Sequence, residues 1–235
     1  MRTLTLGDPA FVGGRMPQLA NTVGLFWASD LAVADTAAVT SWSPTFGSMS
    51  ALAGGTNKPV MAITGLGDRP AVRFTAASSQ TMAQTLSGPT TTWSVITVIK
   101  LATPSGTQAP VALGSDPGTS YAPATISSTW YFRPKFSAGG TPFLTGGTTD
   151  SNPHLVTCVA RSTPAGQIYV DGTSVASAAL TAISSPTNLL LGGTTGNYFG
   201  GDIALVAVID GDVVVDPNWA AFKAWVARYY GLSLS

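Results

Sequence analysis

Apolar and polar residues alternate along most of the chain, and this period of two predicts short β-strands. The clearest predicted strand covers residues 92–101, where apolar and β-branched residues occupy both alternating sets of positions. Residues 154–161 have the same character. Strands that are apolar on both faces are typical of the centre of a sheet. Both segments are therefore predicted to be buried strands.

Two further strand patterns, at residues 167–170 and 173–176, are separated only by Asp171 and Gly172. An Asp-Gly pair between two such runs predicts a type I′ hairpin, because both central residues of that turn need a positive φ. Weaker patterns predict strands at residues 24–28, 59–63, 71–75, 80–86, 109–113, 130–136, 187–191 and 203–209. Short strands joined by Gly-, Pro-, Ser- and Thr-rich connectors favour an all-β, two-sheet antiparallel sandwich over βαβ units.

The pattern changes near the C-terminus, where a single helix is predicted at residues 216–230. Asp216 fits the N-cap, Pro217 fits the first helical position and Gly231 fits the C-terminal stop. Apolar residues recur between them at helical spacing, at Trp219, Phe222, Trp225, Val226, Tyr229 and Tyr230. A stripe this wide indicates a helix packed on the sandwich.

Composition narrows the class of protein further. The 235 residues are 45% hydrophobic and only 9% charged, and none is Glu. Scarce Glu and Lys argue against helical bundles, and a net charge of zero without basic clusters argues against binding nucleic acid or anionic membranes. We expect one domain at residues 21–235, preceded by an N-terminal arm at residues 1–20 that docks on a neighbouring subunit.

The expected compartment follows from what the sequence lacks. Cys158 is the one cysteine, so no internal disulfide is available. The N-terminus has no apolar segment of a signal peptide, and no run reaches the roughly 20 apolar residues of a membrane span. We therefore expect synthesis in a cytoplasm without export by the ordinary signal.

Several segments occur in an order that resembles a known family. They are GLFWASDL at residues 24–31, AVTSW at 38–42, NKPVMAITGLGDRPAVRF at 57–74, NPHLVTCVA at 152–160, GQIYVDGTSVA at 166–176, LLLGGTTGNYFGGDIALVAV at 189–208 and FKAWVARYYGL at 222–232. Together they resemble concanavalin A-like, laminin-G-type jelly rolls of phage and bacterial surface proteins. The resemblance covers roughly residues 20 to 233 and implies a two-sheet jelly-roll sandwich that carries one C-terminal helix.

Some proteins of the family that the chain resembles are glycoside hydrolases, and these use two Glu on one strand. They do so because retaining hydrolysis needs a pair of carboxyl groups. The chain has no Glu, so that motif is absent. The densest Asp group, Asp210, Asp212 and Asp216, is interpreted as a turn before the helix. His154 is the only histidine and begins a strand, where a structural role is favoured. No catalytic residue is predicted.

Calcium is the metal that requires discussion, because several lectins of this fold use it. Asp116, Asp150 and Asp202 are candidate ligands, but no loop concentrates three acids, and Leu205 occupies a position that often carries an acid in the family. One histidine and one cysteine cannot supply a structural zinc site. No cofactor is predicted, and calcium stays open as an alternative.

Sugar binding would use aromatic rings flanked by planar polar groups. The candidate residues are Trp130, Tyr131, Asn197 and Tyr198, with Phe132 and Phe199 beside them. The competing interpretation is ordinary packing in the core or between subunits.

These observations predict a non-enzymatic protein of a virion surface, as a bacteriophage tail protein or capsid decoration that acts in particle structure and adhesion. Its expected partners are other virion proteins or copies of itself, with no nucleic acid and no membrane. The alternative is a carbohydrate-binding, lectin-like module for host cell-wall polysaccharide. A glycoside hydrolase is a second alternative, disfavoured because Glu is absent.

Overall fold

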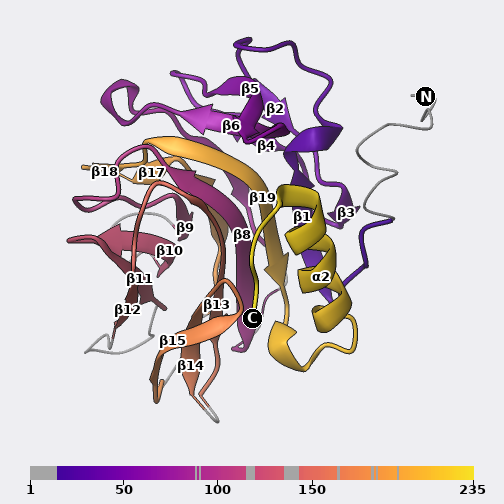
Figure 1. Cartoon of the computed structure of the whole chain (residues 1–235), viewed down its shortest axis with the longest axis vertical. Helices are drawn as coiled ribbons and strands as arrows, with labels where there is room; N and C mark the ends of the chain where they lie inside the picture. Colours follow the sequence, from indigo (N-terminus) through magenta and orange to yellow (C-terminus); the bar gives the residue numbers. More distant parts are fainter. Residues whose placement is uncertain are drawn as a thin grey trace.

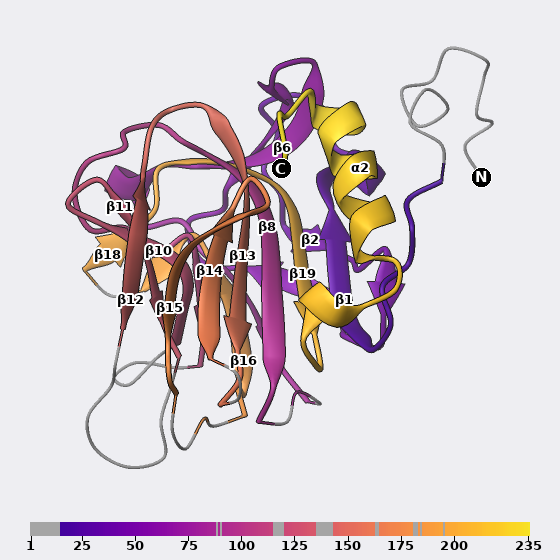
Figure 2. The same ribbon diagram turned by 60° about the horizontal axis from the view of Figure 1, so that its bottom comes forward.

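Among the residues that the structure describes, two large antiparallel sheets and one α-helix form three layers (Figure 1). The structure is a computed structural model that describes residues 15–87, 89, 91–114, 120–134, 143–162, 165–180, 183, 185–194 and 196–235. Sheet A and sheet B pack face to face, and Figures 1 and 2 show helix α2 beside β1 and β19, away from β10–β12. The chain is therefore a β-sandwich with a helix on one outer face.

Sheet A has nine strands in the described part of the chain, with β8 and β19 at its centre. Its order is β15-β14-β13-β8-β19-β1-β3, and β6 pairs with β19 and β5. The strands are β1 (Thr22–Trp27), β3 (Phe46–Gly47), β5 (Val60–Leu66), β6 (Arg69–Phe74), β8 (Trp93–Leu101), β13 (Pro153–Ala160), β14 (Gly166–Val170), β15 (Thr173–Ala178) and β19 (Gly201–Ile209).

Sheet B, as far as the chain is described, has eight strands in the order β12-β11-β10-β9-β16-β7-β4-β2. They are β2 (Ser41–Trp42), β4 (Leu52–Gly54), β7 (Met82–Thr85), β9 (Val111–Leu113), β10 (Ser120–Ile126), β11 (Thr129–Arg133), β12 (Leu144–Thr148) and β16 (Asn188–Leu191). Two short strands, β17 (Gly193–Thr194) and β18 (Asn197–Tyr198), pair with each other. The remaining elements of the described residues are three 3₁₀ helices, η1 (Ala28–Asp30), η2 (Ala76–Ser78) and η3 (Val213–Val215), and helix α2 (Trp219–Tyr230).

The main core fills the space between the sheets. Its largest buried side chains include Trp42, Trp93, Trp130 and Phe132, each with no exposed surface. The rings of Trp93 and Phe132 meet edge to face with centroids 5.8 Å apart, so strands β8 and β11 of opposite sheets are in contact. Burial of such large rings is the main contribution to holding the two layers together.

A second core lies between the other face of sheet A and helix α2. Phe222, Trp225 and Val226 of the helix are buried against a face that contains Ile96 and Val98 of β8. The rings of Trp27 and Trp225 meet edge to face at 5.4 Å, and those of Trp225 and Tyr229 stack at 5.0 Å. Strand β8 is apolar on both faces because one face meets each core, which confirms the prediction for residues 92–101.

The predicted hairpin and helix stop are also confirmed. Asp171 and Gly172 have φ values of 51° and 86°, as a type I′ turn requires, and Gly231 ends the helix with a φ of 69°. The predicted helix start is wrong by three residues, because α2 begins at Trp219 with Asn218 as its N-cap. Asp216 instead closes the preceding turn, where its carboxylate accepts a hydrogen bond from the Asn218 N–H at 2.7 Å.

Two strands of sheet B that the sequence does not indicate, β10 and β12, lie beside β11. The register of β10 with β11 shifts between Tyr121 and Ala124, which breaks the period of two. The sequence of β12 indicates a loop and not a strand, because it contains Gly146 and Gly147. A Cβ at Gly146 would lie 2.2 Å from the carbonyl oxygen of Val175, so this close approach of β12 to β15 requires glycine.

Part of the predicted N-terminal arm belongs to the folded domain. Met16 and Leu19 are buried in the second core. The Ala20 N–H donates to the Asp216 carboxylate at 2.7 Å, and the Asn218 amide donates to the carbonyl of Gln18 at 2.9 Å. Residues 15–20 therefore pack on the chain's own helix, and residues 1–14 lie outside the described residues.

Candidate functional site

Strand β11 separates the predicted aromatic residues onto opposite faces of sheet B. Trp130 and Phe132 point into the main core and have no exposed surface, whereas Tyr131 and Arg133 are partly exposed on the outer face. Successive side chains of a strand point to opposite sides of the sheet. The prediction that Trp130 belongs to a ligand site is therefore corrected, because no ligand at the surface reaches its ring.

Tyr131 lies in a pocket of about 200 Å³ on the outer face of sheet B, which we call the tyrosine pocket. Its ring lies between two other aromatic rings, with centroids 6.1 Å from Tyr121 and 5.6 Å from Phe143. Phe143 is 61% exposed. The residues that line the pocket are Thr107, Gln108, Ala109, Tyr121, Ala124, Thr125, Ile126, Tyr131, Arg133 and Asn197.

Three segments position the polar side chains of the tyrosine pocket. Strands β10 and β11 pair Tyr121 directly with Arg133, so these two residues lie side by side. Asn197 comes from β18 and is held there because its carbonyl accepts the Ala109 N–H at 3.1 Å. The side chain of Gln108 fixes the neighbouring loop: its amide donates to the carbonyl of Thr103, and its oxygen accepts the Gly200 N–H.

The polar groups of the tyrosine pocket are available to a ligand. Across the described residues, the hydroxyls of Tyr121 and Tyr131, the Asn197 amide and the Arg133 guanidinium have no hydrogen-bond partner. Partial burial raises the pKa of the Tyr131 hydroxyl, and the nearby charge of Arg133 opposes that shift. The Tyr131 hydroxyl therefore stays protonated at neutral pH and keeps both donor and acceptor capacity.

The structure brings together two of the four predicted site residues, Tyr131 and Asn197. Tyr198, next to Asn197, is half-buried and does not line the tyrosine pocket. Tyr121 and Arg133, which also line the pocket, and Phe143, whose ring contacts Tyr131, were not predicted. Arg133 lies two residues from Tyr131 on the same strand, whereas the positions of Tyr121 and Phe143 depend on the pairing of β10 and β12 with β11, which no local sequence pattern reveals.

The outer face of sheet B continues from the tyrosine pocket across three more strands. Tyr121 pairs with Ala112, Ala112 with Leu190, and Leu190 with Ala83, so these four residues form one cross-strand row. A shallower hollow of about 360 Å³ lies at the far end of this row and includes Gln84 and Asn188. The two hollows therefore share one face of the sandwich.

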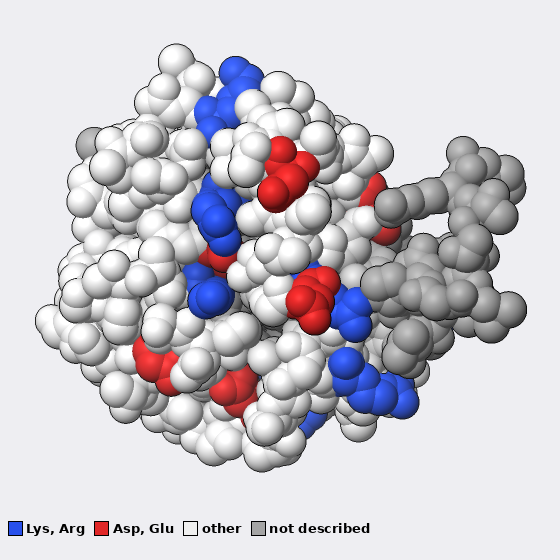
Figure 3. Space-filling view, turned by 45° about the horizontal axis from the view of Figure 1, so that its top comes forward, with Lys and Arg blue, Asp and Glu red and all other residues white. Residues whose placement is uncertain are grey.

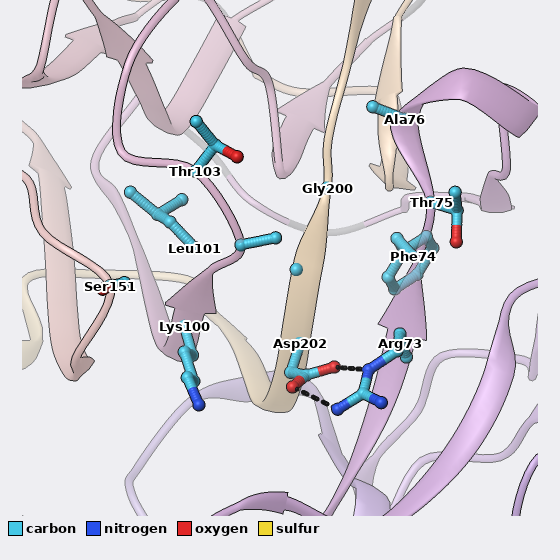
Figure 4. Close-up of a pocket in the computed structure, with 12 residues that line it drawn as sticks. Arg73, Phe74, Thr75, Ala76, Lys100, Leu101, Thr103, Ser151, Gly200 and Asp202 are labelled. Carbon is cyan, nitrogen blue, oxygen red and sulfur yellow. Dashed lines mark hydrogen bonds and ion pairs between the residues drawn. The ribbon is translucent and has the colours of Figure 1, made fainter.

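A third hollow, of about 660 Å³, lies where β6, β8 and β19 of sheet A end (Figure 4). We call it the Arg73 groove. Arg73 donates from Nε and Nη2 to the two carboxylate oxygens of Asp202, at 2.7 and 3.0 Å. Its lining residues are Arg73, Phe74, Thr75, Ala76, Lys100, Leu101, Ala102, Thr103, Ser151, Gly200, Gly201 and Asp202.

The residues considered for catalysis or metal binding have structural partners. His154 lies between two carboxylates, with Nδ1 2.7 Å from Asp171 and Nε2 3.0 Å from Asp150, and these contacts raise its pKa. Burial raises the pKa of the Cys158 thiol well above its ordinary value, which makes it a poor nucleophile.

The described residues hold no cluster of three His, Cys, Asp or Glu side chains that could bind a metal ion. Of the candidate calcium ligands, Asp202 pairs with Arg73, Asp150 contacts His154, and Asp116 lies outside the described residues. Figure 3 shows charged side chains scattered over a largely uncharged face. No helix of the described chain has the length and apolar character needed to span a bilayer.

No protein-family model matches the chain, and no curated protein is similar to it in sequence. Solved structures of similar fold exist at low sequence identity. One is domain 4 of AbnA, an extracellular arabinanase of Geobacillus stearothermophilus, in complex with arabinotriose. It has a TM-score of 0.58 and 12% identity, over 88% of this chain and 99% of that chain.

Two other similar structures are parts of larger proteins. The binding domain of Paraclostridial mosquitocidal protein 1 has a TM-score of 0.62 and 10% identity, over 89% of this chain and 52% of that one. The sialidase of Trypanosoma rangeli, in complex with the inhibitor DANA, has a TM-score of 0.58 and 12% identity, over 95% of this chain and 35% of that one. The chain thus spans about half of the toxin domain and a third of the sialidase. At this identity the likeness establishes the β-sandwich fold.

Proposed function

We propose that the protein is a carbohydrate-binding module and that the tyrosine pocket is its binding site. The observation that carries this proposal is the aromatic surface of Tyr121, Tyr131 and Phe143, beside polar groups of Arg133 and Asn197 that have no hydrogen-bond partner among the described residues. Rings stack on the apolar faces of sugars, and amide and guanidinium groups pair with sugar hydroxyls. The arabinotriose complex of the arabinanase domain supports the same class of ligand.

We propose that the module binds its glycan without hydrolysing it. Hydrolysis of a glycosidic bond generally needs two carboxyl groups on either side of the bond. The described residues that line the tyrosine pocket include no acid, and the chain contains no Glu. Incubation of the protein with any retained oligosaccharide should release no reducing ends, and their release would contradict this part of the proposal.

A glycan array tests the proposal if it includes arabino-oligosaccharides, sialylated glycans and bacterial cell-wall polysaccharides. The wild-type protein should retain at least one class. Tyr131→Ala should lower its affinity about tenfold, because a stacked ring contributes about 1 kcal/mol beyond its buried area. Tyr198→Ala is the matched control, since Tyr198 is also half-buried but lies outside the tyrosine pocket. No retention by the wild-type protein, or equal losses in both variants, would refute the assignment.

We further propose that the sandwich is of the concanavalin A-like type and that the module serves on the surface of a virion. The quoted segments and the largely uncharged surface in Figure 3 support this setting, because a neutral Thr-, Ser- and Gly-rich surface suits close packing between subunits. Mass spectrometry of purified particles from the source of the gene should detect the chain. Its absence from the particles would contradict the virion proposal and leave the glycan proposal intact.

A further inference from the structure

The Arg73 groove is a candidate for a second binding site. Its volume of about 660 Å³ falls within the range of roughly 300 to 1,000 Å³ that is usual for ligand pockets. It lies on sheet A, whereas the tyrosine pocket lies on sheet B, and the two share no lining residue. Ligand in one site therefore does not fill the other.

The charged side chains of the Arg73 groove form one cross-strand row. Asp202 of β19 pairs directly with Arg73 of β6 on one side and with Lys100 of β8 on the other. The Asp202 side chain is only 6% exposed, and both of its oxygens accept hydrogen bonds from Arg73. Arg73 is half exposed and retains Nη1 for another partner. The Asp202 carboxylate is thus already neutralised.

Lys100 supplies the remaining charge. No described acid lies within ion-pair distance of its ammonium group. The lining of the Arg73 groove therefore holds two cations and one carboxylate, an excess of one positive charge, in a chain of which only 9% is charged and whose net charge is zero. A ligand that complements this lining carries negative charge, because hydrogen bonds between ionised groups are the strong ones.

The rest of the Arg73 groove is small and polar. Figure 4 shows the side chains of Thr75 and Thr103 on either side of Gly200. A Cβ at Gly200 would meet Ala76 at 3.6 Å and Ala102 at 4.0 Å, so this position has room for a side chain only at the expense of the groove. Hydroxyl groups beside open backbone suit the hydroxyl-rich body of a sugar.

We propose that the Arg73 groove binds an anionic group, a carboxylate or a sulfate, carried by a saccharide. The saccharide part of this inference rests on the proposed glycan-binding function, and the anionic part rests on Arg73, Lys100 and Asp202 alone. Arg73 and Lys100 would flank the anion, while Gly200 and Gly201, which have no side chains, leave room for the sugar ring.

Calorimetric titration with three oligosaccharides of equal length tests this inference: an oligogalacturonate, a sulfated oligosaccharide and a neutral malto-oligosaccharide. The wild-type protein should bind at least one anionic compound more tightly than the neutral one. Lys100→Gln should weaken that binding roughly tenfold, as expected for the loss of one charged hydrogen bond. Gly200→Leu should abolish it by filling the groove. Arg228→Gln is the charge-matched control, because Arg228 is exposed on α2 outside the groove.

The outcomes separate this inference from the proposed function. Equal affinity for anionic and neutral compounds, or wild-type affinity in Lys100→Gln, would overturn the inference. If Tyr131→Ala removes anionic binding and the groove variants do not, the anion occupies the tyrosine pocket, which refutes the groove and supports the proposed function. If only the groove variants lose anionic binding, the groove is the anion site, and the tyrosine pocket is tested separately by Tyr131→Ala on the glycan array.

Discussion

The outer faces of the two sheets differ in how far other parts of the chain cover them. The outer face of sheet A is covered in part by α2, whose Phe222 and Trp225 are buried there, whereas the outer face of sheet B exposes Phe143 and half-exposes Tyr121 and Tyr131. Both faces carry aromatic rings. On sheet A the rings belong to a core and stabilise the fold, but on sheet B the described chain supplies nothing to cover them.

The comparison shows that aromatic residues indicate function only when their face is known. An exposed aromatic cluster beside unpaired polar groups marks a binding surface more reliably than aromatic content does. Tyr131 and Trp130 are neighbours in sequence and differ in role because one points to each side of β11. Substitutions on the two outer faces should therefore change different quantities.

The largest effect is expected on the covered face. Trp225→Ala should lower the free energy of unfolding by about 3–5 kcal/mol, because it leaves a cavity between α2 and sheet A. Urea denaturation followed by far-UV circular dichroism measures this change. A loss below about 1 kcal/mol would mean that the helix is not part of the stable core.

A smaller loss of stability is expected at the Arg73–Asp202 pair, which lies on the part of sheet A that α2 does not cover. Asp202→Asn should cost about 1–2 kcal/mol, because it weakens the two hydrogen bonds from Arg73. The value lies at the low end for charged groups, since Arg73 is half exposed and solvent screens the pair. The same denaturation experiment checks it, and unchanged stability would show that the pair does not hold β6 against β19.

On the open face, Tyr131→Ala should change stability by less than about 1 kcal/mol while it lowers glycan affinity about tenfold. Trp130→Ala is the reverse case, since loss of this buried ring should destabilise the fold by about 3–5 kcal/mol. Parallel melting curves and binding titrations of the two variants measure the difference. Equal destabilisation in both would break the comparison between the inward and outward sides of β11.

The smallest effect concerns His154, which faces Asp171, Asp150 and the edge of Trp130. The Asp171 carboxylate is the main cause of its raised pKa. The charged pair therefore adds stability that is fully present below the ordinary pKa of 6.5 and is lost as the pH rises through the higher pKa of the folded state. Melting temperatures from pH 6 to pH 9 (roughly the window that a raised histidine pKa sets) should fall for the wild-type protein and fall less for His154→Gln. Parallel curves would contradict this assignment.

The fold could be predicted from the sequence wherever a segment carries its own signal. Strand β8 is apolar on both faces and the Asp171-Gly172 turn has the residues it needs, so both are correct. Strand β12 could not be predicted, because its glycines serve a close approach to β15 that only the folded chain shows. The start of α2 was misplaced because Asp216 closes a turn with the same hydrogen bond that an N-cap makes.

The candidate site could be predicted only in part for a related reason. Tyr131 and Asn197 carry aromatic and amide groups, which single them out, but the face on which each lies depends on strand register. Tyr121 and Phe143 come from separate segments and meet Tyr131 only after β10 and β12 pair with β11. Long-range pairing of this kind has no local signature.

The most direct test of the central claim is a nuclear magnetic resonance titration of the amide-labelled protein with the oligosaccharide that the glycan array identifies. The backbone amide signals of Tyr121, Tyr131, Arg133 and Asn197, and the side-chain amide signal of Asn197, should shift, while those of α2 stay in place. Shifts confined to α2 and the covered face of sheet A, or no shift on sheet B at saturation, would contradict the account.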